Sequence, residues 1–253
     1  MSKLNDLLIA AKQDLPITVR HDQWLSRNAN VKYPPKYVDV VAELLKGGDR
    51  VRIQSFSASS TGQCHRQQVF TYLGMKSKPI DAALANIFHT GNFIHLKWQL
   101  AGLTEGWLAK VEVPLHDEEN RLKGTMDGIL FDGSGFEFKT INSNGYRNVM
   151  QYGPKKEHVL QTHAYMFLTG IKDFSVVYEN KDNGEWRELR VKRDEKVIEE
   201  VRKHLIQLNM HINERLLPPV LDECKKREGK YLRCPYKDSC LKINKLEPET
   251  WSS

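Results

Sequence analysis

Two short segments near the middle of the chain constrain the fold more than any other part of the sequence. Residues 122–131 and 135–141 are apolar or alternating runs, and the turn-forming pair Asp132-Gly133 separates them. Such runs are typical of β-strands, and a turn this short joins neighbouring antiparallel strands. A third run at residues 107–115 precedes them, so we expect an antiparallel meander.

Helical patterns lie on both sides of this meander, and a hairpin with the turn pair Asn183-Gly184 follows it. Helices are predicted at residues 59–73, 79–103, 155–169 and 194–216, and the hairpin strands at 174–179 and 186–191. This order predicts an α/β fold in which helices flank one central mixed sheet.

The chain has 253 residues, enough for one large domain or two small ones. We assign residues 1–50 to an N-terminal helical extension, with its clearest helix at 37–46, and residues 51–253 to the main domain. The apolar run at 7–11 is too short for a secretory signal or a membrane span, so we expect a cytoplasmic protein without membrane contact.

The net charge of +6 is concentrated near the C-terminus. Residues 225–245 contain eight Lys or Arg and two Asp or Glu, which is enough to account for the whole surplus. A basic segment suits a phosphate backbone, and a solvated surface tail is the alternative explanation. The hydrophobic share of 40% is ordinary for a globular protein and excludes a disordered chain.

Two carboxylates, Asp127 and Glu137, lie on neighbouring predicted strands, where they can face each other. Because side chains alternate along a strand, Glu137 and Lys139 share one face while Phe136 and Phe138 point to the other. A metal ion would explain why like charges come together, and Lys139 would then hold or activate a water molecule. An exposed hairpin with solvated charges is the alternative.

Polar side chains on the predicted helices accompany this pair. His95 ends the helical segment Gly91-Asn-Phe-Ile-His95, where a lone histidine is usually structural. Gln161 and Tyr165 are four residues apart and therefore share one helical face.

The order of these residues resembles the RecB-type nuclease branch of the PD-(D/E)xK superfamily. That pattern is Gly-x-x-x-His on a helix, Asp at a strand end, Glu-x-Lys on the next strand and Gln-x-x-x-Tyr on a helix. The resemblance covers residues 59–240, with Thr125-Met126 before the aspartate where the pattern has proline. It implies a restriction-endonuclease-like core.

The resemblance also implies a metal site. His95, Asp127, Glu137 and the carbonyl of Phe138 would ligate one or two Mg²⁺ or Mn²⁺ ions, and Asp127, Glu137 and Lys139 would be catalytic. Such ions supply a nucleophilic oxygen near neutral pH and a counter-charge for the leaving oxygen. Lys139 would orient or deprotonate the attacking water.

The implied activity is a metal-dependent DNA exonuclease that acts on single strands or ends in recombination, repair or replication. Gln161 and Tyr165 would border the active site, and Tyr146, Tyr152 and Trp98 would offer stacking faces if exposed. A non-catalytic DNA-binding module and a nuclease subunit of a larger complex are the alternatives. A homo-oligomer is also compatible with the sequence.

Four cysteines in a cytoplasmic chain favour a metal site over disulfides. Cys64 precedes the predicted core, while Cys224, Cys234 and Cys240 follow it. This arrangement resembles the iron-sulfur branch of the family, which includes CRISPR-adaptation nucleases and the AddB subunit. It implies a [4Fe-4S] cluster that ties residues 224–240 to the helix after Cys64, with Zn²⁺ as the alternative.

Overall fold

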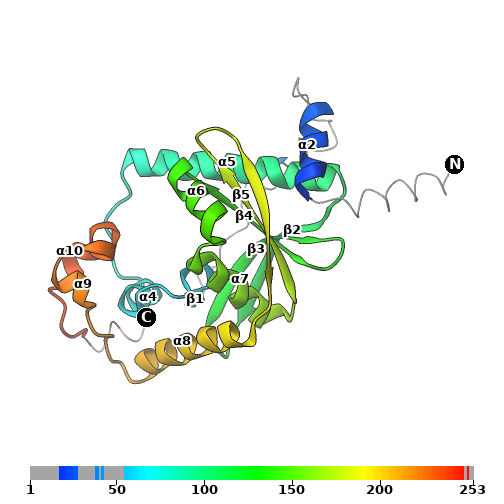
Figure 1. The fold of residues 1–253 in the computed structure, drawn as a ribbon. Coiled ribbons are helices and arrows are strands. Elements are labelled where there is room, and N and C mark those ends of the chain that lie inside the picture. Colours follow the sequence, from blue (N-terminus) through cyan, green and yellow to red (C-terminus); the bar gives the residue numbers. More distant parts are fainter. Residues whose placement is uncertain (1–16, 28–37, 40, 43–53, 248–249, 251–253) are drawn as a thin grey trace.

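The computed structural model describes residues 17–27, 38–39, 41–42, 54–247 and 250. Helices cover both faces of a six-stranded mixed sheet in this part of the chain (Figure 1), which confirms the predicted α/β class with a central mixed sheet. The strands are β1 (Phe56–Ser57), β2 (Leu108–Asp117), β3 (Leu122–Leu130), β4 (Gly135–Ile141), β5 (Asp173–Asn180) and β6 (Trp186–Lys192).

The predicted meander is present, since β2, β3 and β4 are joined by antiparallel pairing. Strand β5 then pairs parallel to β4, and β6 pairs antiparallel to β5. A parallel neighbour requires a crossover connection, and the chain between β4 and β5 supplies one that contains two helices.

Strand β3 has an interrupted edge. Strand β1 pairs with it at residues 122–123, and β4 pairs with it at residues 128–129. Residues 124–127 lie between these two pairings, so β3 and β4 separate at this point. The separation leaves backbone groups that side chains must satisfy.

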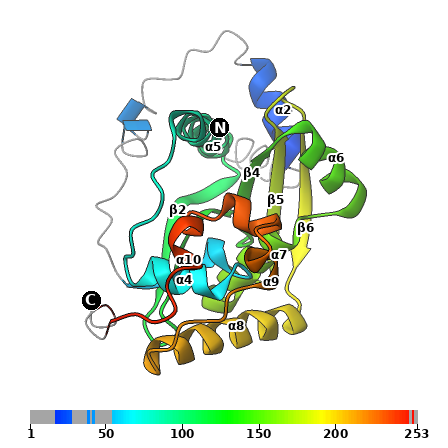
Figure 2. The ribbon, with the colours of Figure 1, turned by 90° about the vertical axis from the view of Figure 1, so that its left-hand side faces the viewer.

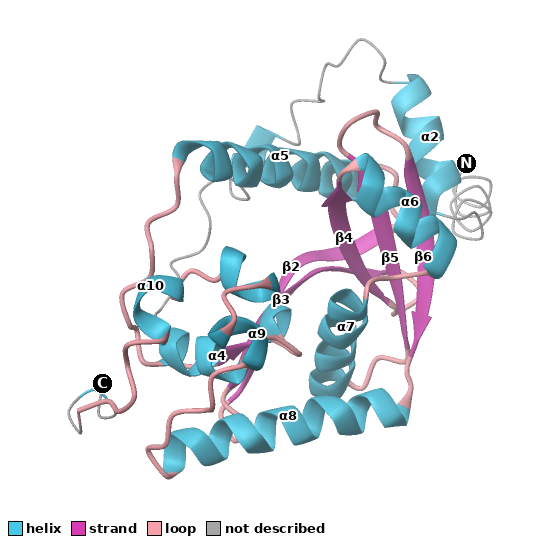
Figure 3. Cartoon of the chain, turned by 60° about the vertical axis from the view of Figure 1, so that its left-hand side comes forward, coloured by secondary structure: helices cyan, strands magenta, loops and turns pink. Residues whose placement is uncertain are grey.

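Different helices cover the two faces of the sheet. On one face, α5 packs on β2 and β4, and α2 packs on α5 and β6. On the other, α7 packs beneath the sheet and α8 packs on α7 (Figure 3). The helices are α2 (Ile17–Arg27), η2 (Ala58–Ser60), α4 (His65–Tyr72), α5 (Ala82–Thr104), α6 (Ser143–Tyr152), α7 (Lys156–Thr169), α8 (Glu195–Asn213), α9 (Asp222–Lys225), η3 (Gly229–Arg233) and α10 (Lys237–Cys240).

Alternation along the strands separates two apolar clusters. Phe136 and Phe138 of β4 join Trp98 of α5 in the cluster under α5. Phe174 and Val176 of β5 join the cluster under α7 and α8. This arrangement directs Glu137 and Lys139 away from the phenylalanines, as the alternation predicts.

The C-terminal elements α9, η3 and α10 lie against α4, which comes much earlier in the sequence (Figure 2). The buried Arg66 guanidinium donates to the backbone carbonyls of Pro218, Cys240 and Ile243. Tyr236 adds a hydroxyl contact of 3.1 Å to Thr71 of α4. Residues 218–243 are therefore held on α4 by polar contacts of the protein itself.

Some elements differ from the sequence prediction. Helix α6 was not predicted, because its run Ser-Asn-Gly carries turn residues, but Asn142 caps it by accepting from Gly145 N–H at 2.9 Å. The helix predicted at 37–46 lies outside the described residues except for 38–39 and 41–42, which are helical. Helix α2, within the predicted extension, packs against the main domain.

Candidate active site

The separation of β3 and β4 creates the candidate site. Asp127 is the last residue of β3 before the pairing with β4 begins, and it is buried. Its Oδ2 accepts a hydrogen bond of 2.7 Å from the backbone N–H of Phe138 on β4. The carboxylate thus replaces a missing ladder bond and is fixed between the two strands.

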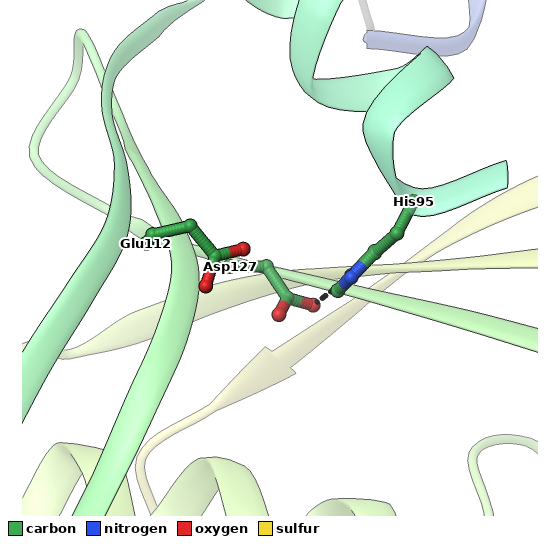
Figure 4. Close-up of side chains that lie close together, drawn as sticks. All are labelled: His95, Glu112 and Asp127. Atoms are coloured by element: carbon green, nitrogen blue, oxygen red, sulfur yellow. Dashed lines mark ion pairs between the residues drawn. The ribbon is translucent and has the colours of Figure 1, made fainter. Parts of the chain in front are cut away.

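Three potential metal ligands meet here, from three different elements. His95 of α5, Glu112 of β2 and Asp127 of β3 offer ligand atoms that all lie within 4.8 Å of one another. Figure 4 shows the two carboxylates and the imidazole turned toward one another. His95 Nε2 lies 2.8 Å from Asp127 Oδ2, although the two atoms are not aligned as a hydrogen bond.

Glu112 is the ligand candidate that the sequence analysis missed. It lies between Val111 and Val113 in an alternating strand, a pattern that normally marks a solvated side chain. Its φ of 47° is in the left-handed region, where a residue with a side chain is strained. Gln99 of α5 donates to its Oε1 at 2.5 Å and so holds the carboxylate toward Asp127.

Glu137 is almost fully buried on the side of α7. Its Oε1 lies 2.6 Å from Lys139 Nζ and accepts a hydrogen bond of 2.8 Å from Gln161 Nε2. Its other oxygen, Oε2, is buried with no partner among the described residues. A buried carboxylate oxygen without a donor is costly, and a cation would relieve that cost.

The charges of these groups shift one another's pKa values. Burial, together with the charge of Asp127, raises the pKa of Glu137 to about 7. Burial lowers the pKa of His95 and of Lys139, but the neighbouring carboxylates outweigh it and raise both. The site therefore holds an excess of negative charge that attracts cations.

The donor set fits a hard divalent cation. Carboxylate and carbonyl oxygens with one imidazole suit Mg²⁺ or Mn²⁺ better than a soft metal. The N–H and C=O of one strand residue point to the same edge, so the Phe138 carbonyl faces the gap that its N–H bridges to Asp127. Glu137 lies near enough for its pKa to respond to Asp127 and His95.

Gln161 and Tyr165 connect the site to the unpaired edge of β3. Gln161 donates to Tyr165 Oη at 2.9 Å, and Tyr165 donates to the Thr125 carbonyl at 2.9 Å. A Cβ at Gly124 would lie 2.7 Å from the tyrosine ring, so glycine is required for this approach. These two side chains support Glu137 and satisfy the backbone of β3.

Of the aromatic residues considered for stacking, Trp98 and Tyr152 differ in their exposure to solvent. Trp98 is fully buried and donates to Glu179, so it is a core residue and not a stacking surface. Tyr152, at the end of α6, is 77% exposed.

The four cysteines, although far apart in sequence, lie near one another. None forms a disulfide. Burial raises the pKa of Cys224, Cys234 and Cys240, and proximity to the other thiols, including Cys64, adds to each shift. No three of their sulfurs, all in described residues, lie within 4.8 Å of one another.

Solved structures share this fold. An alkaline exonuclease from Laribacter hongkongensis, LHK-Exo, is 19% identical with a TM-score of 0.52 over 65% of this chain and 90% of that one. Its complex with dAMP is 18% identical, with a TM-score of 0.53 over the same shares. A protein named SSO0001 is 19% identical, with a TM-score of 0.50 over 85% of this chain and 98% of that one.

These likenesses define the class of fold, which is that of the alkaline exonuclease. No protein-family model matches the sequence, and no curated protein matches it either. None of the helices in the described part of the chain is both long and apolar enough to cross a membrane.

Proposed function

We propose that the protein is a metal-dependent DNA exonuclease. The observation that carries the proposal is the buried Glu137, which has one oxygen on Lys139 and one without a partner, beside the group His95, Glu112 and Asp127. An exonuclease fold around this arrangement supports the same activity. We further propose single-stranded DNA or DNA ends as the substrate, in recombination, repair or replication.

The roles follow from the positions of the side chains. His95, Glu112, Asp127, Glu137 and the Phe138 carbonyl hold Mg²⁺ or Mn²⁺. The bound ion supplies a Lewis acid for the phosphodiester and lowers the pKa of water. Lys139, fixed at 2.6 Å from Glu137, orients the attacking water. Gln161 keeps Glu137 in position through its bond to Oε1.

A time course on end-labelled DNA tests this proposal. Single- and double-stranded substrates labelled at either end are incubated with Mg²⁺ or Mn²⁺ and with wild type, Asp127→Asn or Lys139→Met. We expect wild type to release label progressively and both variants to be inactive while still binding DNA. Lys203→Met, at an exposed lysine of α8, is the matched control for Lys139→Met and should cleave normally.

Two results would contradict the proposal. Equal cleavage by wild type and Asp127→Asn would mean that a contaminating nuclease produces the signal. DNA binding without turnover in any divalent metal would favour a non-catalytic binding module instead.

We also propose that Cys64, Cys224, Cys234 and Cys240 hold a [4Fe-4S] cluster that closes the C-terminal segment onto α4. The four thiols lie near enough to one another for their charges to help raise the pKa values of Cys224, Cys234 and Cys240, which supports one shared metal site. Four thiolates are the usual ligands of such a cluster. Zn²⁺ is the alternative occupant.

Anaerobic purification followed by metal analysis distinguishes the two. A brown protein with broad visible absorbance and about four iron atoms per chain is expected for the cluster. A colourless protein with stoichiometric zinc would show that the cysteines hold zinc and not an iron-sulfur cluster. Cys224→Ser should reduce the bound metal, whichever metal is present.

A further inference from the structure

Helix α7 presents a row of polar side chains toward the candidate active site. His158, Gln161 and Tyr165 are spaced by three and four residues, so they lie on one helical face. Gln161 reaches Glu137 of β4, and Tyr165 reaches the carbonyl of Thr125 on β3. His158 therefore lies one turn beyond Gln161, at the Lys139 end of the site.

Tyr178 places His158 on the same face of the sheet as Lys139. Lys139 and Tyr178 are partners in the parallel register of β4 and β5, so their side chains leave the same face of the sheet. The hydroxyl of Tyr178 lies 2.7 Å from His158 Nδ1. Burial, together with the charges of Lys139 and Lys155, lowers the pKa of His158 to about 3. The imidazole is thus neutral, with the ammonium groups of Lys139 and Lys155 near enough to act on it.

The hydrogen bonds around Tyr178 select the tautomer of this imidazole. The backbone N–H of Lys155 lies 3.4 Å from the tyrosine oxygen and can only donate to it. Among the described residues, His158 Nδ1 is the one acceptor within reach of the tyrosine O–H, so we assign the tyrosine proton to Nδ1, and this assignment places the ring's own proton on Nε2. Within the described residues, no protein atom accepts a hydrogen bond from Nε2, and the side chain is only partly buried.

We infer that His158 contacts the substrate, donating a hydrogen bond from its neutral Nε2–H to a phosphate oxygen of the DNA strand beside Lys139. The inference rests on the proposed nuclease function and names a substrate-binding residue within it. Lys139 and Lys155 supply the charge that attracts the phosphate, and the neutral N–H supplies direction without adding a third repelling cation.

Two substitutions separate the donor from the rest of the side chain. His158→Gln places an amide N–H near the position of Nε2, whereas His158→Asn places its amide near Nδ1. We measure the dissociation constant for DNA with Ca²⁺ present, and kcat/KM with Mg²⁺. We expect His158→Asn to lower kcat/KM about tenfold, the value of one hydrogen bond to a charged group, and His158→Gln to stay within about threefold of wild type.

The salt dependence of binding reports whether the contact is neutral. Loss of a neutral donor leaves the slope of log K against log salt unchanged, whereas Lys155→Gln should reduce it by about 1. His89→Asn, at an exposed histidine of α5, is the matched control and should change neither slope nor kcat/KM. Thermal unfolding of every variant checks that the fold is retained.

Each unfavourable result has a distinct meaning. Normal binding and cleavage by His158→Asn would overturn the inference while leaving the nuclease function intact. A slope reduced by about 1 in His158→Asn would mean that the residue binds as a cation, which contradicts the neutral donor. If His158→Gln falls as far as His158→Asn in a folded protein, the donor role is wrong. If wild type neither binds nor cleaves DNA, function and inference fail together.

Discussion

The Asp127 carboxylate accepts a hydrogen bond of 2.7 Å from the Phe138 backbone N–H, at the point where the ladder between β3 and β4 ends. The same oxygen lies 2.8 Å from His95 Nε2. One side chain therefore bridges two separated strands and also occupies the centre of the candidate metal site.

Removal of the charge at this position should separate the two roles. Asp127→Asn keeps an oxygen that can accept from Phe138, and it removes the repulsion between Asp127 and Glu137. We expect cleavage to be lost while the metal-free protein is at least as stable as wild type. Asp127→Ala removes the acceptor as well and should cost about 1 to 3 kcal/mol of unfolding free energy. Urea unfolding without metal measures both, and an equal loss in the two variants would contradict the bridging role.

Metal binding should depend on pH through Glu137. The raised pKa, about 7 against the ordinary 4.5, means that the folded protein keeps this proton where an unfolded chain has released it. The contribution of this proton to the folding stability of the metal-free protein is fully present below pH 4.5, and it is lost as the pH rises to 7. A cation must displace the proton, so we expect affinity for Mn²⁺ to fall about tenfold for each pH unit below 7.

Calorimetric titration with Mn²⁺ at pH values on either side of 7 measures this dependence. Glu137→Gln is the control, since it carries no titrating proton and should bind weakly with a shallower pH dependence. An unchanged affinity across this range in wild type would argue against Glu137 as a ligand. The raised pKa of His95 acts in the same direction, so His95→Asn should also reduce the dependence.

Tyr165→Phe should weaken the support that Gln161 gives to Glu137. The hydroxyl accepts from Gln161 and donates to the Thr125 carbonyl, so its removal leaves two buried polar groups short of a partner. We expect a loss of about 1 to 3 kcal/mol in unfolding free energy and a lower kcat, because Gln161 no longer holds Glu137 firmly. Chemical denaturation and single-turnover cleavage provide the two measurements. An unchanged kcat would limit Tyr165 to a role in folding.

Arg66 should hold the C-terminal segment on α4 whether or not metal is bound. Its guanidinium is buried and donates to three backbone carbonyls of the C-terminal segment. Arg66→Met removes these donors, and we expect about 2 to 4 kcal/mol of destabilisation with faster hydrogen exchange across residues 218–243. Arg27→Met, at an exposed arginine of α2, serves as the control. Full protection of the segment in metal-free Arg66→Met would show that other contacts suffice.

Much of the fold could be predicted because the informative patterns are local. The alternation in residues 135–141 places Phe136 and Phe138 on the face opposite Glu137 and Lys139, and the structure has this arrangement. Helix α6 was missed because its single cap, Asn142, compensates for turn-forming residues in its first turn. The parallel pairing of β4 with β5 also depends on the crossover through α6 and α7, and the sequences of the two strands do not predict its course.

The amino-acid order alone shows which residue types are available for chemistry. The Asp, the Glu-x-Lys and the Gln-x-x-x-Tyr are each recognisable within one element, and the four cysteines are recognisable from their positions on either side of the predicted core. The packing of elements against one another brings Glu112 to His95 and Asp127, and it brings His158 to Tyr178, the register partner of Lys139. Contacts between elements depend on where strands separate and how closely helices approach. These distances arise from packing of the whole chain, so no local pattern records them.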